Sequence, residues 1–140
     1  MIALALSIAA VLLVLGALHI YWAAGGKAGV GAAVPEVEGQ PAFVPGPNAT
    51  LLVALALTLS ALVVLGRAHL WTPAGIPRSV FSAGTWVLTA LFLLRAVGDL
   101  RLVGFFKRVR GTRFAQRDTL FYSPLCLLLG LGLLALALSR

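Results

Sequence analysis

The sequence predicts an all-α fold: a four-helix transmembrane bundle with a basic cytoplasmic interfacial segment between the third and fourth spans. Apolar residues make up 61% of the 140 residues and charged residues only 11%, against roughly 45–50% and 25% in soluble domains. The apolar residues fall into four runs, each close to the ~20 residues that cross a bilayer. A soluble core is excluded, because so short a chain cannot hide four apolar helices from water.

The first span is predicted over residues 2–23, a run long enough to cross a bilayer. A secretory signal peptide is the alternative, since Ala23 and Ala24 resemble a small-residue cleavage site. The transmembrane interpretation is favoured, because no Lys or Arg precedes the run and because it is longer than the apolar core of a signal peptide.

Residues 24–48 are rich in Gly and Pro, which predicts a loop without regular structure. Asn48 is the expected N-cap of a second span over residues 49–68. A short connection with Pro73 and Pro77 leads to a third span over residues 80–100. All four spans belong to one domain, residues 1–140.

The start of the fourth span, over residues 119–139, is open to two interpretations. Asp118 caps the helix and Pro124 distorts its interior, or Ser123 caps it and Pro124 is the first helical residue. The second choice leaves a helix of only about 24 Å, which is short for a bilayer. We therefore favour a start at Asp118 with a local distortion.

Basic residues set the expected topology. Four spans put both termini on one side and the segments 24–48 and 101–117 on the other. Eight of the eleven basic residues belong to this second side: Lys27, Arg95, Arg101, Lys107, Arg108, Arg110, Arg113 and Arg117. Only Arg67, Arg78 and Arg140 belong to the side of the termini. The positive-inside rule places the two segments in the cytoplasm and both termini outside. We expect a bacterial-type plasma (inner) membrane, because no organelle-targeting pattern is visible.

Polar residues from separate spans are expected to meet at the cytoplasmic boundary. His19 lies about 26 Å along the first span and Arg95 about 23 Å along the third, at about 1.5 Å per residue. Asp99 follows one turn after Arg95, and Asp118 opens the fourth span on the same side. This shared depth predicts a polar site, in which His19 and Asp99 are candidate catalytic residues. The candidate ligand-binding residues are Trp22, Arg95, Arg101, Asp118 and Tyr122.

The chemistry of this site stays open at the level of sequence. Arg95 and Asp99 share a helical face, as an intrahelical ion pair or as a site where Arg95 binds a phosphate or carboxylate. His19 is a proton carrier, a general base oriented by an acid, or a lone ligand. The other histidine, His69, falls on the opposite side, so no bis-histidine cofactor site is expected. Cys126 lies in apolar company, which favours an inert thiol.

The basic segment of the third connection is expected at the lipid surface. Its aromatic rings would enter the headgroup region while its cations meet anionic lipid. The residues concerned are Phe105, Phe106, Lys107, Arg108 and Arg110. The expected partners are membrane lipids with anionic headgroups. Nucleic acid is excluded despite the net charge of +7, because the cations flank apolar spans. No cofactor and no metal site are expected, and homo-oligomerisation is left open.

Several stretches together resemble a known family. HIYWAAGG (19–26), the Pro-rich loop, the long basic stretch (93–118) and LFYSPLCLLLG (120–130) are similar to a bacterial family of small four-span membrane proteins that is known only as a domain of unknown function. The resemblance implies a four-helix membrane fold and no activity. We therefore expect a protein that binds or processes an anionic lipid-like molecule at the cytoplasmic helix ends. A small oligomeric transporter and a structural or accessory subunit are the alternatives, and whether the chain is an enzyme stays undecided.

Overall fold

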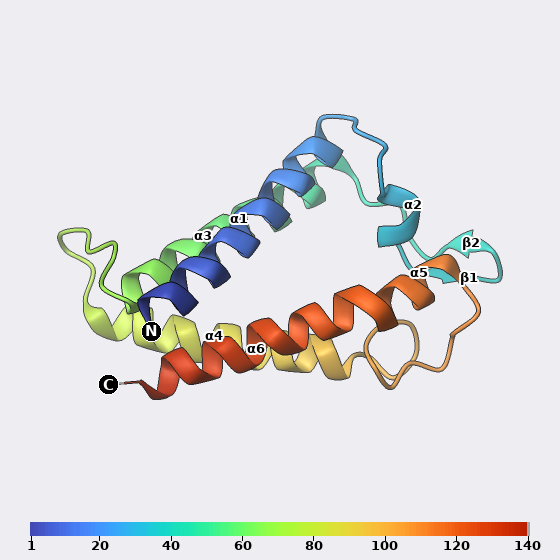
Figure 1. The fold of residues 1–140 in the computed structure, drawn as a ribbon. Helices are drawn as coiled ribbons and strands as arrows, with labels where there is room; N and C mark the ends of the chain where they lie inside the picture. Colours follow the sequence, from blue (N-terminus) through green and yellow to red (C-terminus); the bar gives the residue numbers. More distant parts are fainter. Residues whose placement is uncertain (140) are drawn as a thin grey trace.

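The computed structural model describes residues 1–139, so that Arg140, counted above among the basic residues, lies outside the described part. Within it, four helices are long and apolar enough to cross a membrane. They are α1 (Ile2–Ala23), α3 (Pro47–Arg67), α4 (Arg78–Val97) and a composite of α5 (Arg113–Arg117), η1 (Asp118–Tyr122) and α6 (Ser123–Leu138) (Figure 1). The predicted all-α, four-span fold is confirmed, and the chain is a multi-pass membrane protein.

Two helices begin earlier than expected. Pro47 opens α3 behind the N-cap Gly46, so Asn48 lies in the first turn instead of capping it. Proline suits this place because its fixed φ is helical and its missing N–H would have had no intrahelical partner. The helix α4 begins at Arg78, behind Pro77, and ends at Val97. It stops short of residue 100, because Gly98 at φ 91° turns the chain away from the helix axis.

The fourth span begins five residues before the favoured start. Thr112 caps it by accepting a hydrogen bond of 3.1 Å from the Ala115 N–H. The helix then continues to Leu138 through a π-helical turn over residues 118–122. The expected distortion is therefore present. Pro124 explains it, because its ring clashes with the carbonyl four residues earlier in an α-helix, and a wider turn relieves that clash.

The four spans form two pairs that converge at one end of the molecule. The helix α1 packs along α3, and α4 packs along α6 (Figure 1). We call the end with both termini the terminal end and the end with residues 24–46 and 98–112 the loop end. The apolar core lies toward the terminal end and consists of Ala5, Ile8, Ala9, Leu12, Ala61, Val64, Leu129, Leu133 and Leu136. Away from this core the pairs diverge toward the loop end (Figure 1).

The segment between α1 and α3 is more ordered than the sequence predicted. It contains α2 (Val30–Ala33) and an antiparallel hairpin of β1 (Glu36–Val37) and β2 (Gln40–Pro41). Both α2 and β1 pack against α5, and the Tyr122 hydroxyl donates a hydrogen bond of 3.1 Å to the Ala32 carbonyl. At the loop end, the two helix pairs are thus connected by the segment between α1 and α3, which contacts α5, and not by packing of the long spans on one another (Figure 1).

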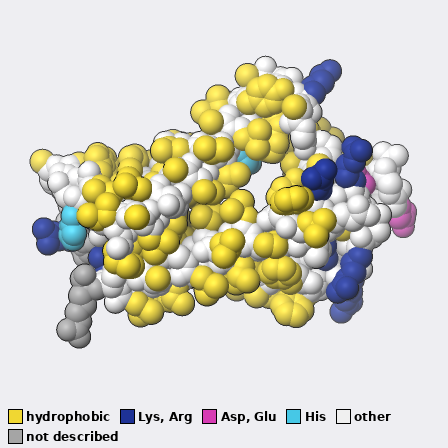
Figure 2. Space-filling model, in the orientation of Figure 1, with side chains coloured by type: hydrophobic (Ala, Val, Ile, Leu, Met, Phe, Trp, Pro, Cys, Tyr) yellow, Lys and Arg dark blue, Asp and Glu magenta, His cyan; other side chains and the backbone are white. Residues whose placement is uncertain are grey.

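Hydrophobic side chains cover the flanks of the molecule, while Lys and Arg side chains gather at its ends (Figure 2). Many large apolar residues on the helices are exposed, including Val14 at 68% and Leu128 at 68%. Such a surface is unfavourable in water and suits hydrocarbon, which accepts apolar side chains without cost.

We predict that Gly98→Ala destabilises the protein by at least about 2 kcal/mol, because the residue combines a strained backbone with a close contact. A Cβ at Gly98 would lie 1.9 Å from the Val103 carbonyl oxygen, which is backbone and cannot rotate away. Equilibrium unfolding in mixed micelles measures the change. Gly111→Ala is the control, since a Cβ there meets nothing within 4 Å, and equal stability of the two variants would contradict this account.

Candidate functional site

A buried carboxylate organises the loop end. Asp118 lies at the first residue of the π-turn and is fully buried at 0% exposure. Its Oδ1 accepts a hydrogen bond of 2.8 Å from Arg95 Nη2 on α4. Its Oδ2 accepts from the Gly104 N–H at 2.8 Å, from Lys107 Nζ at 3.0 Å and from Ser123 Oγ at 3.1 Å. One side chain therefore joins α4, the loop after it and the fourth span.

Lys107 is the partner that sequence reasoning placed elsewhere. It was expected at the lipid surface, yet it is only 2% exposed. Its ammonium donates to the Gly104 carbonyl at 2.9 Å, to Asp118 and to Thr119 Oγ1 at 2.7 Å, so all three of its protons have acceptors. A charged lysine stays buried only with such partners. Its position within a basic, aromatic run gives no signal of this role.

The cluster of Arg95, Lys107 and Asp118 carries one more positive than negative charge. Asp118 takes part in both ion pairs of the described residues, at 2.8 Å to Arg95 and 3.0 Å to Lys107. Lys107 is enclosed, whereas the Arg95 side chain is 34% exposed. Arg95 Nη1 is covered and has no hydrogen-bond partner within residues 1–139. The excess charge of the cluster is therefore accessible only at Arg95.

Arg95 borders a shallow cavity between α3 and α4 that is open to the outside, which we call the lateral cavity. It has a volume of about 410 Å³ and is lined by Leu52, Val53, Ala56, Leu57, Ser60, Leu88, Leu91, Phe92 and Arg95. Apart from the Ser60 hydroxyl, which donates to the Ala56 carbonyl at 2.7 Å, the lining side chains other than Arg95 are apolar. The cavity therefore offers an apolar wall with a single cation at its loop end.

His19 and Trp22 line a second cavity, the loop cavity, of about 670 Å³ between α1, α3 and the segment 24–48. Val53 lines both cavities, so they adjoin. The two rings meet edge to face at 5.1 Å. His19 Nδ1 lies 2.7 Å from the Leu15 carbonyl, which favours a proton on Nδ1 and leaves Nε2 as the acceptor. The space-filling view shows the surface hollowed between the helix pairs (Figure 2).

Asp99 has a structural use that the sequence did not reveal. Its Oδ1 accepts hydrogen bonds from the N–H groups of Arg101, Leu102 and Val103 at 2.8, 2.7 and 3.0 Å. Partial burial raises the pKa of Asp99, but these three donors lower it by more, so the pKa lies below its ordinary value. The expected contact with Arg95 does not form, because α4 ends at Val97 and Arg95 pairs with Asp118 instead.

The remaining sequence candidates are spread over the loop end. Arg101 is exposed and its carbonyl accepts from the Arg108 and Val109 N–H groups, at 3.2 and 3.0 Å. Phe106 is 63% exposed, in keeping with a position at a lipid surface, and Arg108 and Arg110 are also exposed. Phe105 is half-buried. Tyr122 ties the π-turn to α2 instead of lining a cavity.

The structure thus joins Arg95 to Asp118 directly and adds Lys107, Gly104 and Ser123 to them. His19 and Trp22 belong to the adjoining loop cavity, and Asp99 is engaged by its own loop. The three residues that sequence reasoning missed carry no signal in the chain, since a glycine, a serine and one lysine among many cations acquire their roles only from the fold.

A family model described as "Protein of unknown function (DUF3995)" matches residues 2–133 of the chain. Neither the curated proteins nor the solved structures contain a match.

We predict that Asp118→Asn destabilises the protein by about 3–5 kcal/mol, because it leaves the buried Lys107 ammonium without a counter-charge. The same substitution made in a Lys107→Met background should cost at least about 1 kcal/mol less, since the enclosed cation is then absent. Equilibrium unfolding of the four proteins of this cycle gives the coupling. Glu38→Gln, in the exposed hairpin, is the control and should stay within about 0.5 kcal/mol of wild type; an additive cycle would contradict the assignment.

A second prediction concerns acid pH. Because the pKa of Asp99 is lowered in the folded protein, its charge stabilises the fold above the unfolded pKa of about 3.9, and this contribution is lost as the pH falls through the folded pKa. The unfolding free energy of wild type should therefore approach that of Asp99→Asn below about pH 4 and exceed it at pH 7. Subtracting the two pH profiles removes the other acids, and a difference that does not change with pH would count against the prediction.

Proposed function

Since the chain belongs to the DUF3995 family, whose description states no activity, we propose a function from the geometry of the loop end. The protein binds a single-chain anionic amphiphile, with the anionic head on Arg95 and the apolar chain in the lateral cavity. Following the positive-inside rule, we place the loop end at the cytoplasmic face of a bacterial-type plasma membrane.

The unbalanced charge of the buried cluster carries this proposal. Asp118 anchors the Arg95 guanidinium at Nη2 alone, while the rest of the side chain borders the lateral cavity. A covered N–H without an acceptor costs about 1–3 kcal/mol. A small rotation of the guanidinium would present Nη1 to a carboxylate or phosphate in the cavity, and planar, bidentate donors suit such anions.

The lining of the lateral cavity supports an acyl chain in preference to a polar ligand. Its walls come from α3 and α4, two spans that face lipid on their outer sides, so a lipid-like molecule can enter from the bilayer without crossing water. Hydrocarbon does not favour apolar contact by itself, since lipid tails are as apolar as leucine. The preference for one amphiphile over another must therefore come from its head group. A cation near hydrocarbon, such as Arg95, strongly prefers an anionic head.

The adjoining residues have secondary roles in this proposal. The loop cavity, with His19 and Trp22 in its wall, extends the space available beside Val53 for a larger head or for a second molecule. His19 Nε2, left as an acceptor, can receive a hydrogen bond from a hydroxyl group of such a head. Asp99 has no role toward His19 in this proposal, since its Oδ1 caps its own loop and the His19 ring is oriented by the Leu15 carbonyl.

We predict that the purified protein binds a fluorescent long-chain fatty acid about tenfold or more tightly than the matching fatty alcohol, because only the carboxylate accepts charge-assisted hydrogen bonds from Arg95. Titrations in neutral detergent measure both affinities. Arg95→Gln should remove the preference for the acid, and the exposed Arg101→Gln should keep it.

A second variant keeps the test valid if Arg95→Gln unfolds. Ala56→Phe fills the lateral cavity without touching the charge cluster, and it should weaken binding of the acid and of the alcohol alike. Equal affinities of wild type for the two probes, or full binding by Ala56→Phe, would refute the proposed function.

A further inference from the structure

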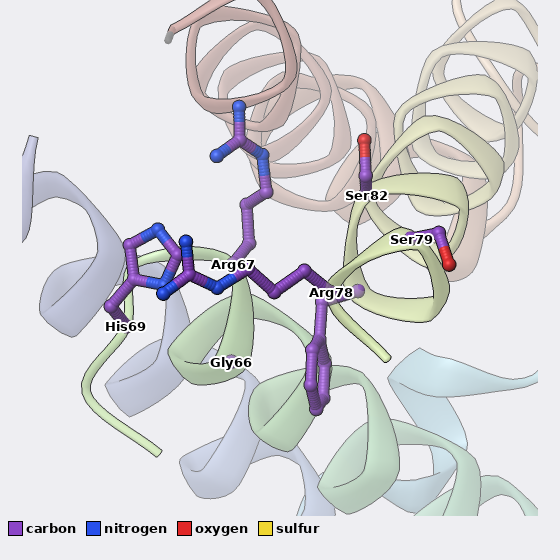
Figure 3. Close-up of a pocket in the computed structure, with 7 residues that line it drawn as sticks. Gly66, Arg67, His69, Arg78, Ser79 and Ser82 are labelled. Carbon is purple, nitrogen blue, oxygen red and sulfur yellow. The ribbon is translucent and has the colours of Figure 1, made fainter. Parts of the chain in front are cut away.

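A third cavity lies at the terminal end, at the opposite end of α3 and α4 from the Asp118 cluster. Its volume is about 270 Å³, and its lining comes from the end of α3, the connection after it and the start of α4: Gly66, Arg67, His69, Arg78, Ser79, Phe81 and Ser82. Figure 3 shows the Arg78 side chain extending across this cavity toward His69, while Arg67 is directed toward the adjacent helix. Gly66 permits this shape, because a Cβ there would lie 2.3 Å from the Phe81 ring.

Among residues 1–139, the charged side chains that line this cavity are the two arginines Arg67 and Arg78. The four acidic residues of the chain, Glu36, Glu38, Asp99 and Asp118, belong to the loop end. Both ion pairs in residues 1–139 involve Asp118, so neither arginine of the cavity has an acidic partner there. Two arginines that line one cavity without an acidic side chain among the described residues favour the binding of an anion.

Arg67 already has a structural task. Its Nη2 donates to the Ala137 carbonyl at 3.4 Å and to the Ser139 carbonyl, and so holds the end of the fourth span against α3. Cations are favourable at such a helix C-terminus. Its Nε is covered and has no partner within the described residues. Arg67 therefore adds positive charge near the cavity, but its hydrogen bonds to the fourth span prevent it from turning toward a ligand.

Arg78 and His69 occupy positions that local rules disfavour. Arg78 is the first residue of α4, where the helix dipole opposes a cation and where no side chain caps the free N–H groups. His69 has φ 60° just after α3, a left-handed conformation that glycine normally supplies and that costs other residues about 1–2 kcal/mol. Both irregular choices bring a potential anion ligand to the same cavity, and sequences break local rules chiefly at functional sites.

We propose that this cavity binds a phosphate group. Arg78 supplies planar, bidentate donors and His69 a ring N–H beside them, while Ser79 and Ser82 also line the cavity (Figure 3). The first turn of α4 adds to this, because the free N–H groups and the positive end of the dipole at a helix N-terminus favour an anion. A cavity of about 270 Å³ is smaller than the roughly 300–1,000 Å³ of drug-sized pockets and suits a compact head. The phosphate comes from a lipid headgroup or from free phosphate.

The test uses the full chain and two probes. In neutral detergent, inorganic phosphate is titrated against chloride of equal ionic strength, and the midpoint of thermal unfolding is recorded. In nanodiscs of phosphatidylcholine with a minority of phosphatidic acid, native mass spectrometry counts the retained lipid. The variants are Arg78→Gln and His69→Gly. Arg113→Gln, an exposed cation at the loop end, is the matched control for net charge.

We expect Arg78→Gln to bind phosphate or retain phosphatidic acid about tenfold less than wild type, and Arg113→Gln to match wild type. His69→Gly should raise the midpoint without ligand, because glycine relieves the left-handed strain, and should still weaken binding, which a purely structural histidine would not do. A response to inorganic phosphate identifies the free anion, and retention of phosphatidic acid alone identifies a headgroup. No response to either probe, or equal behaviour of Arg78→Gln and Arg113→Gln, overturns the proposal.

Discussion

The carboxylate of Asp118 is the constraint on which the loop end depends. A charged group at 0% exposure is stable only when its acceptor sites are filled, and here two cations, a backbone N–H and a hydroxyl fill them. These donors come from α4, from the loop after it and from the fourth span itself. The ion pairs thereby fasten α4 and the loop after it to the start of the fourth span, beyond the apolar core at the terminal end.

Much of the architecture could be predicted from the sequence, because membrane spans are set by length and hydropathy. The limits of α4 and of the fourth span were less accessible. The end at Val97 is set by the Gly98 backbone and by Asp99, whose three hydrogen bonds redirect the chain. The early start at Arg113 depends on the Thr112 cap, and the ordered hairpin of residues 36–41 depends on packing against α5. These are tertiary effects.

The site could be predicted only in part for the same reason. Helical spacing suggested that Arg95 would meet Asp99, four residues on, whereas the real partner lies 23 residues away. Depth was the informative quantity, since it correctly grouped Arg95 with Asp118. It could not distinguish Lys107, buried at 2% exposure, from its exposed neighbours Arg108 and Arg110. Adjacent basic residues have the same sequence pattern, and only the tertiary fold decides which of them is buried. Depth also gave no reason to connect Arg78 with His69 across the opposite end.

The π-turn over residues 118–122 has a consequence for the registration of the fourth span. One wide turn accommodates an additional residue, so the side chains before and after it are out of phase by about 100° relative to an uninterrupted α-helix. With this change of phase, Asp118 faces Arg95 and Lys107 while Leu133 and Leu136 face the core. An uninterrupted α-helix could not direct both ends of the span in this way. Deletion of a single residue from this turn would restore a regular α-helix and rotate its two halves against one another. The number of residues in the turn is therefore constrained as tightly as their identity.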